Sequence, residues 1–280
     1  MIREWKDDGT TCRRRPFVTL TYAQSLDGKI AIHQQSEEEK EEEEEEEENG
    51  AKQKGPSSNL VLSGPDSLLM THGLRSIHDA ILVGGSTLLV DNPRLSNRLW
   101  GSRQHQQQQQ QHQPIPVVLD TNLQSVTKLG ALRKAKNILV CCSHEAATNV
   151  DVSVDDDKNK FTAIPCNTTN DGTLDLRDVL LRLYERGIRS VMVEGGAQVL
   201  TSFVTTNNND DDNDHHHHQP LVDCVCVTIS PKLIGQANGI PSIHNIPSIA
   251  HPYVNLANND NGGRFISLGD DCVFLCRQQQ

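Results

Sequence analysis

The chain lacks the features that would place it in a membrane or outside the cell. It has no apolar segment near the roughly 20 residues that a membrane-spanning helix needs. Its first fifteen residues are charged and have no apolar centre, so we expect neither a secretory signal nor a membrane anchor. Its eight cysteines include no CxxC pair, and most lie in or beside apolar runs. We therefore expect buried thiols rather than disulfides or a zinc site, in a cytoplasmic protein.

Several common active-site motifs are absent as well. There is no GxGxxG fingerprint, no P-loop and no GxSxG, and no histidine is obviously paired with a nucleophilic Ser or Cys. Aromatic residues are few, with three Tyr, two Trp and five Phe, which argues mildly against an aromatic-rich pterin cleft. The His215–His218 run lies among Asn and Asp, which is typical of a solvated expansion. Nucleophilic catalysis and a resident metal therefore have little support.

Three low-complexity tracts interrupt the chain, at residues 34–58, 102–113 and 206–219. They are rich in Glu, in Gln, and in Asn, Asp and His, and such compositions bury too little apolar surface to offset chain entropy. We therefore expect disordered loop inserts within a single folded domain over 16–277. Eleven Glu and one Lys at 37–48 account for most of the formal net charge of −11. The remainder is near neutral, which suits an anionic small ligand and offers no basic face to nucleic acid.

The rest of the chain alternates short apolar runs with helical patterns. Strands are predicted at residues 17–23, 79–83, 116–120, 137–142, 188–193 and 221–229, and a hairpin turning near 269–270 is predicted over 264–276. Asp175–Arg186 has leucine and valine at i, i+3, i+4 and i+7, which indicates a helix. Another helix is expected to run from Ser63, as its cap, to about Arg75. The alternation predicts an α/β fold with a mostly parallel central sheet and helices on both faces.

Two predicted strands end in a glycine turn that opens a helix, and these turns are the most informative feature of the chain. They are Val83-Gly84-Gly85-Ser86-Thr87 and Val193-Glu194-Gly195-Gly196-Ala197. At such a turn the backbone N–H groups of a helix start are aimed at a phosphate, and glycine lets the main chain approach the ligand closely. One such turn is weak evidence, because tight turns use glycine for other reasons. Two in one chain favour a phosphate-rich ligand.

Polar residues near these turns are candidate ligand contacts, each with a structural alternative. Thr87 could donate to a phosphate or a ribose, or could bond its own helix backbone. Asp91 could accept from a ribose hydroxyl or a nicotinamide amide, or could simply end a helix. Arg75 and Arg98 could hold a substrate phosphate, or could be surface charges. Glu194 is harder to dismiss, because a solvated acid rarely ends a buried strand.

Longer segments resemble the riboflavin-biosynthesis reductases and follow that family's order. They are Phe17–Ile30, Ser63–Asp66, His78–Gly84, Thr87–Arg98 and Val193–Gly196. The resemblance implies a dihydrofolate reductase-like fold, NADPH as the hydride donor and a homodimer. The implied substrate is a 2,5-diamino-6-ribosylamino-pyrimidinone 5′-phosphate, whose ribosyl chain is reduced to ribityl.

The resemblance also implies roles for particular residues. Those that would contact NADPH are Thr87, Asp91, Gly195, Gly196, Ala197, Gln198 and Val199. Those that would line the substrate side are Ser63, Arg75, Leu95, Arg98 and Glu194. Arg98, with Arg75 or Lys29, would hold the 5′-phosphate, while no residue is identified as the catalytic acid.

Bacterial members of this family are fused to a zinc deaminase, which needs a His-x-Glu and a Pro-Cys-x-x-Cys. Here Pro165-Cys166 is followed by Asn167-Thr168-Thr169 with no second cysteine, so we expect no deaminase in this chain. Two other functions stay open. One is a reductase of the same fold acting on a pterin, and the other is a non-catalytic nucleotide-binding protein whose polar tracts recruit partners. The residues alone also leave NADPH against NADH open.

Overall fold

The computed structural model describes residues 14–32, 61–101, 112–126, 137–149, 161–205, 221–235, 239–243 and 263–277, with short pieces at 129–130, 132, 135 and 237. The predicted inserts 34–58 and 206–219, and most of the insert 102–113, lie outside the described residues. Gln113, the last residue of that insert, is described. Its side-chain amide accepts from the N–H of Asn97 at 3.0 Å and donates to the Asn97 carbonyl at 2.9 Å. The folded chain therefore resumes slightly earlier than its glutamine-rich composition suggests.

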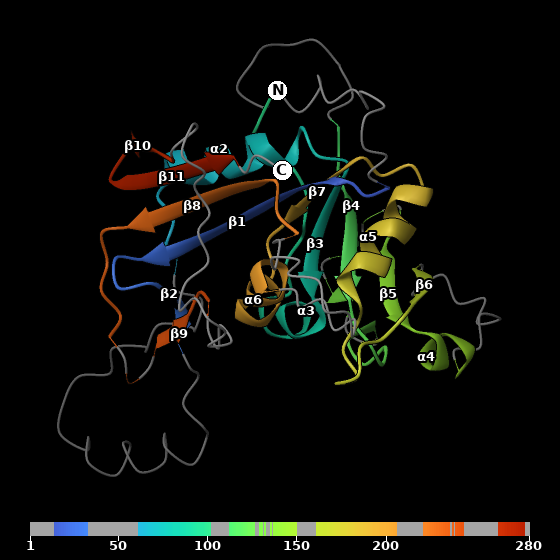
Figure 1. Cartoon of the computed structure of the whole chain (residues 1–280). Coiled ribbons are helices and arrows are strands. Elements are labelled where there is room, and N and C mark those ends of the chain that lie inside the picture. Colours follow the sequence, from blue (N-terminus) through green and yellow to red (C-terminus); the bar gives the residue numbers. More distant parts are fainter. Residues whose placement is uncertain are drawn as a thin grey trace, which may run out of the picture.

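A nine-stranded sheet forms the centre of the fold (Figure 1). Its strands in spatial order are β10 (Arg264–Leu268), β11 (Asp271–Arg277), β8 (Cys224–Ser230), β1 (Phe17–Ser25), β7 (Ser190–Val193), β3 (Ala80–Gly84), β4 (Ile115–Leu119), β5 (Leu139–Ser143) and β6 (Thr162–Cys166). The strands from β8 to β6 are parallel, whereas β11 runs antiparallel to β8 and forms a hairpin with β10. The predicted mostly parallel sheet and the predicted hairpin are both confirmed.

Helices cover both faces of this sheet, because successive side chains along a strand point to opposite faces. In β3, Leu82 packs into a core with α5 (Leu176–Glu185) and α6 (Ala197–Thr205). Its neighbour Val83 packs into a second core, which includes side chains of α2 (Pro65–Arg75), α3 (Gly85–Asp91) and α4 (His144–Asn149). Figure 1 shows α3 and α6 next to each other at one edge of the sheet, below β3. The predicted two-sided covering is therefore confirmed.

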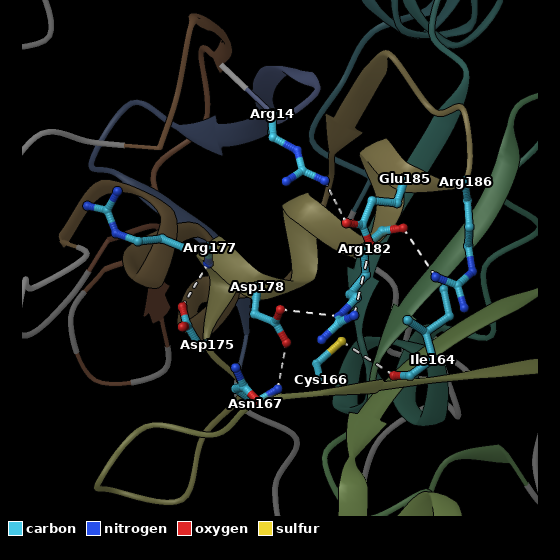
Figure 2. A network of polar contacts seen from close by, with 10 residues as sticks. All are labelled: Arg14, Ile164, Cys166, Asn167, Asp175, Arg177, Asp178, Arg182, Glu185 and Arg186. Atoms are coloured by element: carbon cyan, nitrogen blue, oxygen red, sulfur yellow. Dashed lines mark hydrogen bonds and ion pairs between the residues drawn. The ribbon is translucent and has the colours of Figure 1, made fainter. Parts of the chain in front are cut away.

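The helix α5 follows its sequence pattern closely. Asp175 caps it by accepting a hydrogen bond from the N–H of Arg177 at 2.9 Å, and Leu176, Val179, Leu180 and Leu183 are buried in the core. Its charged residues form a network (Figure 2), in which Arg182 pairs with Asp178 at 3.2 Å. Asp178 also accepts from the N–H of Asn167 at 2.7 Å. The helix therefore fixes the loop that leaves β6.

Ser63 does not cap α2, so that prediction is wrong. The N-cap residue is Gly64, whose N–H donates to the Asp271 carboxylate of β11 at 2.7 Å. An acid brought by the tertiary fold thus lies at the helix start where a local hydroxyl was expected. Sequence reasoning also missed β6, α4, and a short ladder between β2 (Lys29–Ile32) and β9 (Gly239–Pro241). Their sequences lack the continuous apolar runs that marked the predicted strands 79–83 and 188–193.

Candidate functional site

The two glycine turns lie side by side at the carboxyl edge of the sheet. β3 and β7 are parallel neighbours with Leu82 opposite Val193, so the turns that follow them begin at the same level. The N–H of Gly196 donates to the Thr87 hydroxyl oxygen at 3.0 Å, which ties the start of α6 to the first turn of α3. Thr87 therefore stabilises the partner turn, an arrangement that neither sequence alternative included. Its own O–H can still donate to a ligand.

Three glycines of these turns lie too close to neighbouring side chains to carry a Cβ without a shift. A Cβ at Gly195 would lie 2.7 Å from the Cβ of Val199, and a Cβ at Gly84 would lie 2.9 Å from a methyl carbon of the same valine. A Cβ at Gly196 would lie 3.0 Å from the Thr87 hydroxyl. Close approach of main chain to neighbouring side chains is one of the reasons a fold needs glycine. Contact of these glycines with a phosphate stays a prediction.

A cavity of about 690 Å³ opens beside the two turns. Gly84–Ser86 and the α6 residues Gln198 and Val199 form part of its lining. Its other walls are the segment 119–125 after β4, the loop 168–175 between β6 and α5, and the first α5 residues, Leu176 and Arg177. Each wall follows the carboxyl end of a parallel strand, where open α/β sheets bind their ligands. This volume is typical of small-molecule sites. Many of the lining residues carry hydroxyl or amide groups, so the cavity suits a polar ligand of the size of part of a nucleotide.

Arg75 and Glu194 form a bidentate ion pair near this edge. The Arg75 Nε donates to one carboxylate oxygen at 2.8 Å and Nη2 donates to the other at 2.6 Å, and each side chain is 13% exposed. The third nitrogen, Nη1, donates to the Ser96 carbonyl at 3.1 Å. Burial alone would lower the pKa of Arg75, but the charge and hydrogen bonds of Glu194 raise it overall. The two residues predicted for the substrate side thus hold each other, and neither is among those lining the cavity.

The segment after α3 brings further arginines near this pair. The backbone N–H of Arg98 donates to Nδ1 of His72 at 3.0 Å. Burial, together with the charges of Arg75 and Arg98, lowers the pKa of His72 to about 4, so this ring is neutral at pH 7. Partial burial and the charges of Arg94 and Arg75 lower the pKa of Arg98. A bound anion would relieve that repulsion, which favours an anion beside Arg98.

The remaining predicted residues do not all gather at one place. Leu95 is 2% exposed in the core, with φ of +43°, so very little of this residue is accessible to a substrate. Ser63 and Arg75 lie at opposite ends of α2, roughly 16 Å apart along the helix. Asp91 is largely exposed at the end of α3, where partial burial raises the pKa of its carboxyl. The structure brings Arg75, Arg98 and Glu194 close to one another, and leaves Ser63 apart from them.

Sequence reasoning missed two walls of the cavity. Asp120 directly follows β4, and its carboxylate accepts from the N–H and hydroxyl of Ser125, at 2.6 and 2.5 Å, and from the N–H of Gln124 at 3.0 Å. The loop 168–174 follows β6, a strand that the sequence did not reveal. The signal that could have found both is positional: polar residues directly after a parallel strand belong to the ligand edge.

These features define an α/β protein with a polar ligand cavity at the carboxyl edge of a parallel sheet. Within the described ranges, no three His, Cys, Asp or Glu side chains are grouped to hold a metal ion. Across the same residues, no helix combines the length and hydropathy that a membrane crossing requires.

Residues 16–260 match the family described as RibD C-terminal domain, and the chain belongs to this family. It is 30% identical over 238 residues to the 2,5-diamino-6-ribosylamino-4(3H)-pyrimidinone 5′-phosphate reductase of Debaryomyces hansenii, covering 80% of this chain and 78% of that one. It is 32% identical over 196 residues to the enzyme of that name from Saccharomyces cerevisiae, covering 68% and 66%. The predicted resemblance to riboflavin-biosynthesis reductases is confirmed, and the chain is an oxidoreductase.

Solved structures of related proteins share the fold. The Saccharomyces cerevisiae riboflavin biosynthesis reductase Rib7 aligns with a TM-score of 0.59 at 23% identity, over 96% of this chain and 92% of that one. The deaminase/reductase from Thermotoga maritima aligns with a TM-score of 0.60 at 22% identity, over 95% of this chain and 57% of that one. The predicted fold class is thereby confirmed.

Proposed function

We propose that this chain reduces a 2,5-diamino-6-ribosylamino-pyrimidinone 5′-phosphate to its ribitylamino form with NADPH, in riboflavin biosynthesis. The observation that carries the proposal is the arrangement around Glu194 and Gly195. On one side lies a polar cavity that suits part of a dinucleotide, and on the other lies the Arg75–Glu194 pair with its neighbouring arginines. The names of the yeast relatives support this choice of substrate.

The cavity residues would hold the cofactor. The first turn of a helix has backbone N–H groups without intrahelical partners, and in α6 these belong to Ala197, Gln198 and Val199. Such groups favour a phosphate, and Thr87 can add its O–H. When bound, NADPH supplies the hydride that the imine carbon of the opened ribosylamine accepts. The predicted contact at Asp91 remains part of this proposal.

Charged side chains would form the substrate side of the site. Arg98, with Arg94 close enough to affect its pKa, would hold the 5′-phosphate by charge-assisted hydrogen bonds. Glu194 is held in place by Arg75, and each carboxylate oxygen keeps a further lone pair that can accept from an amino group or a sugar hydroxyl. Ser63 and Leu95 complete the proposed contacts. Orientation by these fixed groups is the contribution of the protein to the reaction.

The nearby histidines are poor proton donors. His72 is neutral at pH 7, because the pKa of its ring is lowered to about 4. His78 has both ring nitrogens engaged, one with the Leu74 carbonyl at 2.7 Å and the other with the Thr19 hydroxyl at 2.8 Å, and burial lowers its pKa. We therefore assign the proton that reaches nitrogen to water or to a substrate hydroxyl.

The direct test uses the full-length protein, the pyrimidinone phosphate and NADPH. We expect substrate-dependent loss of the reduced-nicotinamide absorbance. Dihydrofolate in place of the pyrimidinone, measured in parallel, distinguishes the pterin alternative. Oxidation with dihydrofolate alone would replace the substrate proposal, and oxidation with neither would remove the reductase proposal. Removal of 34–58 and 206–219 should leave the activity in place, whereas a protein that works through its polar tracts would lose its function.

The phosphate contact has its own test. Arg98→Gln should raise the KM for the phosphorylated substrate at least about tenfold, as expected for loss of a charged hydrogen bond, and should leave the dephosphorylated compound unaffected. Arg186→Gln, on the exposed end of α5, is the matched control. An equal change for both compounds would remove Arg98 from the phosphate site.

We also propose a homodimer, for which the hairpin edge of the sheet supplies a surface. β10 is an edge strand among the described residues, and Phe265 and Ile266 on it are 67% and 47% exposed. Exposed apolar side chains on a sheet edge commonly mark a contact with another chain. Light scattering should give twice the monomer mass for the native protein and one monomer mass for Phe265→Asp. The cytoplasmic location predicted from the sequence belongs to this proposal as well.

A further inference from the structure

We propose that Arg177 selects NADPH over NADH by receiving the 2′-phosphate of the adenosine ribose in the cavity. This inference rests on the proposed function, because it takes the cavity as the cofactor site. It names the residue that discriminates between the two cofactors, a choice that the sequence left open.

The charges on the cavity wall leave one residue that can attract a phosphate. Among the described residues that line the cavity, Arg177 is the one cation, and Asp120, Asp171 and Asp175 are the acids. A wall with three acids and a single base disfavours a phosphate unless the base is close to it. An additional phosphate on the ligand therefore has Arg177 as its partner in this wall.

The three acids of this wall already accept hydrogen bonds from groups of the protein. Asp120 accepts from Ser125 and Gln124, and Asp175 caps α5. Asp171 accepts from the hydroxyl and N–H of Thr173, at 2.9 and 3.2 Å, and from the hydroxyl of Thr169. Dinucleotide sites that prefer NADH use an acid to accept from the ribose 2′-hydroxyl, whereas an arginine accommodates the 2′-phosphate. The cavity-lining arginine fits the second pattern.

The position of Arg177 in the fold also favours an anion beside it. It lies in the first turn of α5, where the helix dipole favours a negative charge. Figure 2 shows its guanidinium directed away from the Asp178–Arg182 pair. The loop beside it adds hydroxyl groups to the cavity lining, from Thr168, Thr169 and Thr173. A planar guanidinium beside hydroxyl donors is well suited to a phosphate monoester.

The test measures binding of nucleotide fragments and needs no turnover. Titration calorimetry at low salt with 2′,5′-ADP and with 5′-AMP isolates the 2′-phosphate, which is the one difference between the two probes. The native protein should bind 2′,5′-ADP at least tenfold more tightly than 5′-AMP. Arg177→Ala should weaken 2′,5′-ADP about tenfold or more and leave 5′-AMP within twofold, while Arg186→Ala at the other end of α5 should change neither.

A second variant works in the opposite direction. Asp171→Asn removes one acid from the same wall and should tighten 2′,5′-ADP about threefold without affecting 5′-AMP. Native protein that binds the two probes equally, or an Arg177→Ala variant that loses both equally, would overturn the assignment while leaving the cavity as a nucleotide site. Native protein that binds neither probe would overturn the cofactor site itself, together with this inference.

Discussion

Two bidentate arginine–carboxylate pairs lie at opposite ends of the parallel strands. Arg15 donates to Asp223 at 2.6 and 2.8 Å where β1 and β8 begin, and Arg75 donates to Glu194 at 2.8 and 2.6 Å where β7 ends. All four side chains are largely buried. Their surroundings differ, because Asp223 also accepts from the backbone N–H of Val18, at 2.8 Å, whereas Glu194 adjoins the glycine turns. The same chemistry therefore serves the fold at one edge and, in our proposal, the ligands at the other.

The largest effect should come from breaking the first pair. Asp223→Asn leaves Arg15 without its buried counter-charge and weakens the bond to Val18, so the free energy of unfolding should fall by about 3–5 kcal/mol. Urea unfolding followed by circular dichroism measures this loss. Activity per folded molecule should stay near that of the native protein, and a large fall in it would break the division between the two edges.

The second pair should respond in activity as well as in stability. Glu194→Gln leaves the buried Arg75 without its counter-charge, so stability should fall as it does for Asp223→Asn. It also removes the charge that we propose faces the substrate, so kcat/KM per folded molecule should fall about 100-fold, or about 2.7 kcal/mol. Steady-state kinetics on protein verified as folded measures this. Activity within threefold of the native value would show that Glu194 is, like Asp223, a structural acid.

The site edge should also be the more sensitive to acid. The pKa of His72 is about 4 in the folded protein, against an ordinary value of 6.5. Between pH 6.5 and 4 the unfolded chain binds a proton that the folded protein does not, so stability is lost as the pH falls, by at most about 1.4 kcal/mol per pH unit. His72→Asn, which keeps an acceptor for the Arg98 N–H, should show a shallower loss across this window. Identical slopes for the two proteins would contradict the shifted pKa.

The smallest expected effect concerns the bond between the two glycine turns. Thr87→Val removes the acceptor of the Gly196 N–H and should lower stability by about 1 kcal/mol and NADPH affinity a few-fold. Thr71→Val is the matched control, because its hydroxyl bonds only the Ser67 carbonyl of the same helix turn at 3.0 Å. Differential scanning calorimetry and cofactor titration measure the two effects. If Thr71→Val weakens NADPH as much, the bond between the turns has no special role.

Local patterns in the sequence were enough to predict the frame of the molecule. The spacing of leucine and valine predicted α5, and apolar runs predicted β1, β3 and β7. The glycine turns could also be located, because strand, glycine and helix follow one another within ten residues. Each of these signals depends on neighbours in the chain, which a sequence shows directly.

Partners distant in the chain could not be predicted. Glu194 lies 119 residues from Arg75, and nothing in either segment indicates that they pair. Asp271 occupies the start of α2 from 207 residues away, which is why the local hydroxyl of Ser63 was the wrong cap. The cavity wall at 168–177 was missed for a related reason, since β6 becomes a strand only by pairing with β5.

One valine side chain is the nearest obstacle to a Cβ at both Gly84 and Gly195. These three positions therefore cannot drift independently over evolution. Because the Cβ of Val199 itself lies 2.7 Å from the place of a Cβ at 195, alanine at 195 requires glycine at 199 or a shift of the start of α6, so the order of substitutions matters.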